Sequence, residues 1–215
     1  MNNEKIIVTA EMLDELRNIV STMMDERRFS HTLGVEREAE ALGKLFLPFE
    51  VMRLRAAALL HDITKQYKTE KQLKICEEFG IIISDGLRAS PKLFHALTGS
   101  LVAKRDLSEY ADEEMIGAVR WHTTGRAGMT LFESLIYLAD YIEDTRTFED
   151  CIILRKLFYM NIEKARTEEE KLEVLRRTMI SSFDMTMKQL IADGAPIDRD
   201  TVEARNYFVA NSVKK

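Results

Sequence analysis

Apolar side chains recur every three or four residues along most of this chain, which is the spacing of one face of an α-helix. Together with capping and breaking residues, this pattern predicts helices over about 9–27, 31–46, 48–62, 69–79, 91–107, 112–121, 130–142, 149–160, 168–191 and 200–209. The chain has only three prolines and nine glycines, so few residues oppose helix formation. We therefore expect an all-α fold with little or no strand.

Boundary signals refine these helices. Thr9 and Ser30 are expected to cap the first two, which places a bend at Arg27–Phe29. Gly80 is expected to end the fourth helix, because glycine commonly closes a helix. The stretch 84–86, Ser-Asp-Gly, is predicted to be a loop.

The length and apolar content predict one domain. At 215 residues and 46% hydrophobic residues, the chain can bury one sizeable core. We expect a single domain over 1–215, with a core part at about 10–146. Two longer amphipathic helices and a closing segment form a C-terminal helical extension at about 147–210.

Charge and cysteine content limit the partners. The formal net charge of −5 gives no general attraction to nucleic acid or an anionic membrane, so we expect a small-molecule partner. Neither a secretory leader nor an apolar run of ~20 residues is present in the sequence, which favours a cytoplasmic protein. Cys76 and Cys151 are expected to be free thiols. The sequence leaves a homodimer open.

The helix predicted to start at Pro48 ends in a polar pair, His61 and Asp62, followed by Lys65. Adjacent residues do not share one face of a helix, but at its C-terminus both side chains can turn toward one centre. A buried carboxylate without a partner carries a penalty of several kcal/mol, and a bound cation would remove it. We interpret the pair as a candidate metal site.

Further polar residues lie near predicted helix ends, namely His31, His95, His122 and Asp140. A lone histidine is more often structural than a ligand. Four histidines with two aspartates, however, form a donor set suited to a divalent metal. Imidazole with carboxylate favours iron, manganese, cobalt or zinc over Mg²⁺ or Ca²⁺, which prefer oxygen ligands alone.

These residues belong to ordered sequence blocks. His31, the His61–Asp62 pair and Asp140 match the H…HD…D signature of the HD superfamily of metal-dependent phosphohydrolases. The blocks around them are Arg27–Val35, Ala57–Lys65, His95–Gly99, Trp121–Gly125 and Tyr137–Glu143. They look like successive blocks of the YqeK family of bacterial HD-domain enzymes, and the similarity extends from about Leu13 to Phe208.

The resemblance implies a fold, an activity and a set of metal ligands. The fold would be an HD-domain helical bundle with the metal site between helix ends, and members of the family cleave diadenosine tetraphosphate symmetrically into two ADP. His31, His61, Asp62 and Asp140 would bind a principal ion, with iron the family's choice. His95 and His122 would hold a second ion or contact phosphate, and Asp62 would bridge two ions if both are present.

The implied reaction is attack of a metal-bound hydroxide on phosphorus, with ADP as the leaving group. Asp62 and Lys65 are the expected catalytic residues, because Lys65 follows Asp62 by about one helical turn and can balance charge on the polyphosphate. The expected nucleotide contacts are Arg28, Lys65, His95, Thr98, His122, Thr123, Arg146, Thr201 and Arg205. Two alternatives remain open: another HD-type nucleotide or alarmone phosphohydrolase, and a metal- and nucleotide-binding sensor without turnover.

Overall fold

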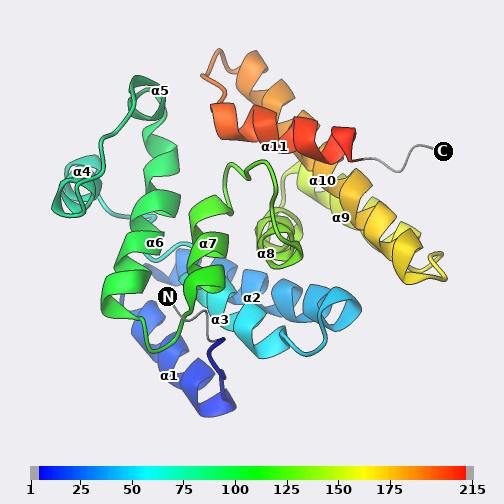
Figure 1. Ribbon diagram of the computed structural model, residues 1–215, viewed down its shortest axis with the longest axis horizontal. Coiled ribbons are helices and arrows are strands. Elements are labelled where there is room, and N and C mark those ends of the chain that lie inside the picture. The colour runs from blue at the N-terminus through cyan, green and yellow to red at the C-terminus, as the bar shows by residue number, and fades with distance from the viewer. Residues whose placement is uncertain (1–4, 212–215) are drawn as a thin grey trace.

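The computed structural model describes residues 5–211, and this range contains helices but no strand (Figure 1). The all-α prediction is confirmed. The helices are α1 (Ala10–Ser21), α2 (Glu26–Phe46), α3 (Val51–Leu60), α4 (Thr69–Glu78), α5 (Asp85–Arg88), the 3₁₀ helix η1 (Pro91–Leu93), α6 (Phe94–Asp106), α7 (Glu113–Trp121), α8 (Leu131–Ile142), α9 (Glu149–Ile162), α10 (Glu168–Ala192) and α11 (Arg199–Ala210).

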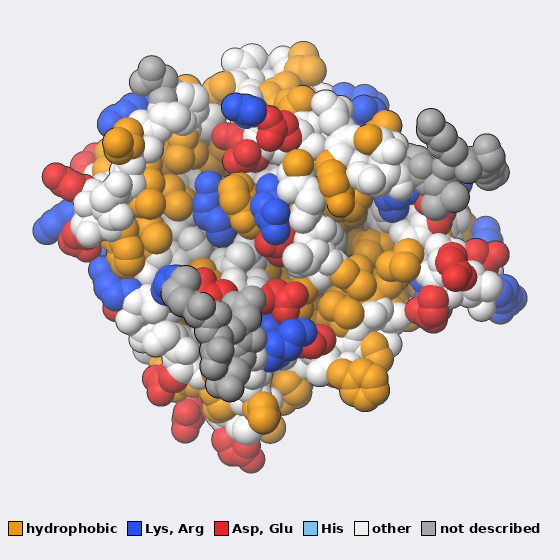
Figure 2. Space-filling model, viewed as in Figure 1, with side chains coloured by type: hydrophobic (Ala, Val, Ile, Leu, Met, Phe, Trp, Pro, Cys, Tyr) orange, Lys and Arg blue, Asp and Glu red, His pale blue; other side chains and the backbone are white. Residues whose placement is uncertain are grey.

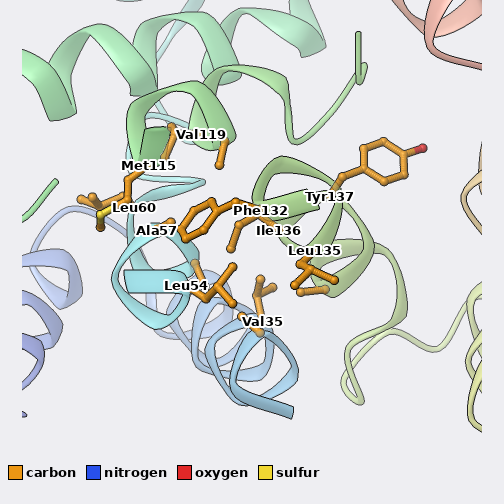
Figure 3. Close-up of a cluster of buried hydrophobic side chains, with 14 of the residues drawn as sticks. Val35, Leu54, Ala57, Leu60, Met115, Val119, Phe132, Leu135, Ile136 and Tyr137 are labelled. Carbon is orange, nitrogen blue, oxygen red and sulfur yellow. The ribbon is translucent and has the colours of Figure 1, made fainter. Parts of the chain in front are cut away.

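Helix α3 lies at the centre of the bundle and packs against α1, α2, α7 and α8. The side chains of Ala56–Ala58 are fully buried, and their small size lets the surrounding helices approach α3 closely. Figure 3 shows Leu54 and Ala57 of α3 beside Phe132 of α8 and Val35 of α2. This packing fixes the C-terminal end of α3, from which the His61–Asp62 pair follows.

The C-terminal helices α9, α10 and α11 lie together on one side of the bundle, next to α8 (Figure 1). Phe183 of α10 packs against Tyr137 of α8, with ring centroids 4.8 Å apart and the ring planes tilted by 37°. Gly125, in the loop between α7 and α8, approaches the same phenyl ring closely, and a Cβ there would lie 2.8 Å from Phe183 Cζ. One apolar cluster therefore includes residues of the bundle and of the extension.

The helix boundaries confirm some predictions and correct others. Thr9 caps α1 by accepting a hydrogen bond from Met12 N, and Gly80 follows α4 with a positive φ of 66°, both as expected. The predicted bend at Arg27–Phe29 is wrong, because α1 ends at Ser21 and α2 begins at Glu26. Asp25 is the N-cap of α2 in place of Ser30, since its carboxylate accepts from Arg28 N.

Two further boundaries differ from the predictions. The stretch 84–86, predicted to be a loop, contains the start of the short helix α5. The third helix begins at Val51, three residues after Pro48, because Leu47 and Glu50 first form a turn through Glu50 N and Leu47 O.

The surface carries charges of both signs. Figure 2 shows acidic and basic side chains interspersed over one face of the molecule. None of the helices within residues 5–211 has the length and apolar character needed to cross a membrane.

Candidate metal centre

The six side chains predicted to bind metal come together from five helices or helix ends. His31 lies near the start of α2, His95 near the start of α6, and Asp140 in the last turn of α8. His61 and His122 are the C-cap residues of α3 and α7, and Asp62 follows His61. Asp25 capping places Arg28 and His31 one turn apart, so both side chains lie on one face of α2.

Four of these side chains form a first group. His31 Nε2 lies 3.1 Å from Asp140 Oδ1 and 3.8 Å from Asp62 Oδ2. His61 Nε2 lies 3.3 Å from Asp62 Oδ2 and 3.9 Å from Asp140 Oδ1. Two imidazole nitrogens and two carboxylate oxygens thus face one centre.

The other oxygen of Asp62 belongs to a second group. Asp62 Oδ1 lies 3.2 Å from His95 Nε2 and 3.6 Å from His122 Nε2. The two Nε2 atoms of these histidines are 3.1 Å apart. Asp62 therefore lies between two sets of donors and contributes one oxygen to each.

Backbone carbonyls fix the orientation of three histidine rings. The Nδ1 atoms of His61, His95 and His122 lie 2.6, 2.7 and 2.7 Å from the carbonyl oxygens of Ala58, Lys92 and Val119. A carbonyl oxygen only accepts, so each Nδ1 carries the proton and donates it. Each Nε2 consequently presents a lone pair to the cluster, as a metal ligand requires.

The donor set fits a divalent cation. Among residues 5–211, the buried side-chain atoms without a hydrogen-bond partner are His31 Nε2, His61 Nε2 and Asp62 Oδ1, all in this cluster. Buried polar atoms are rarely left without a partner. The lone pairs of His95 and His122 also face each other, which is repulsive without a proton or cation between them. Divalent cations bound at the two groups would satisfy these atoms.

Around both aspartates and two of the histidines, the electrostatic surroundings favour the protonation states that metal binding needs. Burial opposes ionisation of Asp62 and Asp140, but it is outweighed by neighbouring histidines, Lys65 and Arg146, which hold the pKa of both carboxyls well below the usual range. Burial lowers the pKa of His61 and His95. The two carboxylates are therefore anionic, and the two imidazoles neutral, at neutral pH.

Glu143 is a site residue that sequence reasoning missed. It is fully buried and accepts hydrogen bonds from His31 Nδ1 at 3.0 Å and from Thr145 N at 2.7 Å. Burial works against a charged His31, but Asp140 and Glu143 outweigh it and raise the pKa of His31 to about 9. The signal was available, because Glu143 follows Asp140 by three residues and therefore lies on the same side of α8.

The lack of a side chain at Gly34 makes room for the Glu143 carboxylate. A Cβ at Gly34 would lie 2.3 Å from Glu143 Oε2, closer than any real contact allows. The absence of a side chain on this turn of α2 is therefore what lets the carboxylate reach His31.

Basic side chains surround the carboxylates. Arg28 donates to Asp62 Oδ2 at 2.9 Å, and Arg146 pairs with the Asp140 carboxylate. Lys65 Nζ lies 3.1 Å from His95 Nε2 and 4.0 Å from Asp62 Oδ1, and burial lowers its pKa. Thr123 Oγ1 lies 3.2 Å from His95 Nε2. The structure thus brings these four predicted nucleotide contacts to the cluster.

Three other predicted contacts are engaged elsewhere. Thr98 is fully buried, and its hydroxyl bonds with Phe94 O, Gln72 Oε1 and Thr64 Oγ1. Thr98 thus lies next to the turn that follows α3, where Thr64 also donates a hydrogen bond to His95 O. Thr201 and Arg205 lie on α11, where Thr201 is buried and Arg205 donates to Asp184 of α10 at 2.9 Å.

A match to a known family identifies the fold. The family model described as HD domain matches residues 28–145, a segment that contains all six candidate ligands. The chain therefore belongs to the HD domain family.

Comparison with known proteins narrows the family. The chain is 32% identical over 199 residues to the "Bis(5'-nucleosyl)-tetraphosphatase, symmetrical" of Bacillus subtilis, which covers 93% of this chain and 98% of the relative. A protein of the same name from Halalkalibacterium halodurans is 31% identical over 191 residues, covering 89% and 94% of the two chains. Within the HD domain family, the chain groups with these YqeK-type proteins.

A solved structure agrees with this grouping. The crystal structure of a "predicted HD superfamily hydrolase involved in NAD metabolism" from Clostridium acetobutylicum superposes with a TM-score of 0.81 at 31% identity. The match covers 96% of this chain and 100% of that chain. The C-terminal extension as well as the bundle is therefore shared.

Proposed function

We propose that this protein cleaves diadenosine tetraphosphate symmetrically into two ADP, using a divalent cation at the His–Asp cluster. The observation that carries the proposal is Asp62, whose two oxygens face two sets of buried imidazole donors. The names of the relatives support the substrate, because both are symmetrical bis(5'-nucleosyl)-tetraphosphatases along nearly their whole length.

In the proposed reaction, water supplies an oxygen to one of the two central phosphorus atoms. The bond from that phosphorus to the central bridging oxygen breaks, and the second ADP leaves with this oxygen. A divalent cation, when bound, lowers the pKa of water and polarises phosphoryl oxygens. His31, His61, Asp62 and Asp140 would hold a principal ion, and His95 and His122 would complete a second set with Asp62.

The basic residues at the cluster would bind the polyphosphate. Arg28 and Arg146 can direct planar guanidinium groups at phosphate oxygens, a geometry that suits forked hydrogen bonds. Lys65 lies on the His95 side, where its ammonium can neutralise charge on the departing phosphate. Thr123 offers a hydroxyl on the same side.

We propose iron as the native metal, since a site rich in imidazole with two carboxylates suits iron and also admits manganese, cobalt or zinc. Protein purified with and without oxygen and analysed for metals tests this proposal. Iron or manganese in at least equimolar amount is expected. Zinc alone, with full activity, would contradict the assignment of iron.

A comparison of substrates tests the activity. We expect a higher kcat/KM for diadenosine tetraphosphate than for nucleoside triphosphates or guanosine tetraphosphate. A preference for one of those nucleotides would contradict the proposed substrate and would indicate another HD-type nucleotide or alarmone phosphohydrolase. Binding of metal and nucleotide without any turnover would indicate that the protein is a sensor and not an enzyme.

A further inference from the structure

A cavity of about 670 Å³ opens beside His31, between the start of α2 and the segment that joins α8 to α9. Its walls include Arg28 and Arg146, the two arginines that pair with the cluster carboxylates. The volume is within the range of small-molecule sites. The cavity therefore adjoins the metal centre on the side of His31.

Phe148 stands out among the residues that line this cavity, because it contributes the only phenyl ring of the described lining. Its side chain is 69% exposed, although it directly precedes α9. An exposed apolar residue alone needs no explanation. Here, however, the ring belongs to a concave site with basic groups, which is the setting of a ligand contact.

The chain geometry places Phe148 close to the phosphate-binding groups. Phe148 follows Arg146 by two residues, so their Cα atoms are at most about 7 Å apart. The Arg146 side chain holds Asp140 through both its carboxylate and its backbone carbonyl. The Phe148 ring and the Arg146 side chain therefore line the same cavity, beside His31.

The wall of the cavity carries charged groups of both signs. Its arginines, Arg28 and Arg146 among them, attract phosphate, whereas the carboxylates of Asp25 and Glu26 would repel it. Carboxylates can instead accept hydrogen bonds from an exocyclic amino group. Gln66 adds an amide to this wall, although it already bonds with Asp25.

We propose that this cavity binds one nucleoside half of the substrate, with Phe148 as the surface on which its base stacks. This inference rests on the proposed function for the identity of the substrate. The polyphosphate would run along Arg28 and Arg146, and the purine would lie flat on the phenyl ring. Aromatic rings are effective partners for bases because every base has a π face.

Binding of ADP and of pyrophosphate to manganese-loaded protein tests the proposal without requiring turnover. Pyrophosphate contains the phosphates but no base. Phe148→Ala is expected to weaken ADP binding about 5- to 100-fold and to leave pyrophosphate binding unchanged. Phe148→Trp is expected to restore ADP binding, since the indole also stacks.

Phe49→Ala is the matched control, because Phe49 is 99% exposed and lies outside this cavity. Equal losses for ADP and pyrophosphate, or no loss for ADP, would overturn the role of Phe148. The two proposals fail separately. Wild-type protein that binds ADP through Phe148 but leaves diadenosine tetraphosphate intact contradicts only the proposed function, whereas unchanged ADP binding in Phe148→Ala contradicts only this inference.

Discussion

At the scale of single residues, the site depends on which nitrogen of each imidazole ring faces the centre. Carbonyl groups one turn earlier in the chain orient His61, His95 and His122. His31 instead depends on the Glu143 carboxylate, and Glu143 reaches it because Gly34 has no side chain. Such supporting contacts typically alter metal affinity by about 10- to 100-fold when removed.

Gly34→Ala is therefore expected to weaken Mn²⁺ binding about 10- to 100-fold, because the added Cβ would push the Glu143 carboxylate away from His31. Titration calorimetry measures the change. Gly86→Ala is the control, since Gly86 is also helical and has nothing within 4 Å of its added Cβ. Wild-type affinity in a folded Gly34→Ala protein would show that Glu143 does not support the metal site.

At the scale of the secondary-structure elements, periodicity and capping residues predicted most of the helices. The start of α2 was predicted wrongly because both Asp25 and Ser30 are good capping residues. Asp25 prevails in the structure, where its carboxylate accepts from Arg28 N and Gln66 Nε2. Tertiary contacts of this kind, here with a residue 41 positions away, are not visible in a local pattern.

The candidate ligands could be predicted because each belongs to a recognisable motif in the sequence. The structure brings all six together. Contacts that depend on how separate elements pack could not be predicted. Thr98 has the right motif but faces Thr64 and Gln72 in the interior. Glu143 was missed although it follows Asp140 by three residues, because this spacing does not show which ring on another helix the carboxylate will touch.

The loop between α7 and α8 gives a test at this scale. Gly125→Ala is expected to lower the free energy of unfolding by about 2–4 kcal/mol, because a φ of +66° disfavours a side chain and the new Cβ would overlap the Phe183 ring. Gly80→Ala, with the same φ and no neighbour within 4 Å, should cost only about 1–2 kcal/mol. Urea unfolding measures both. Equal losses would contradict tight packing of Phe183 on this loop.

At the scale of the whole molecule, the prediction of a single domain depends on how firmly the C-terminal extension joins the bundle. The apolar cluster runs from Val8, just before α1, to Ala204 in α11. Phe183 of α10 contacts the ring of Tyr137 across this boundary, and Phe158 of α9 lies beside Phe46 of α2. A shared core of this kind favours cooperative unfolding.

We therefore expect one unfolding transition in urea. The fluorescence of Trp121, at the end of α7, should change at the same midpoint as the helical circular dichroism, to which the extension also contributes. Separate midpoints would show that the extension unfolds independently and would contradict the single-domain prediction.

The measurement that tests the central claim most directly is chromatography of the products formed from diadenosine tetraphosphate by metal-loaded protein. ADP as the only nucleotide product is expected from wild-type protein, and Asp62→Ala is expected to lose both metal and turnover because Asp62 serves both groups of ligands. AMP together with ATP, or turnover that survives in Asp62→Ala, would contradict the account.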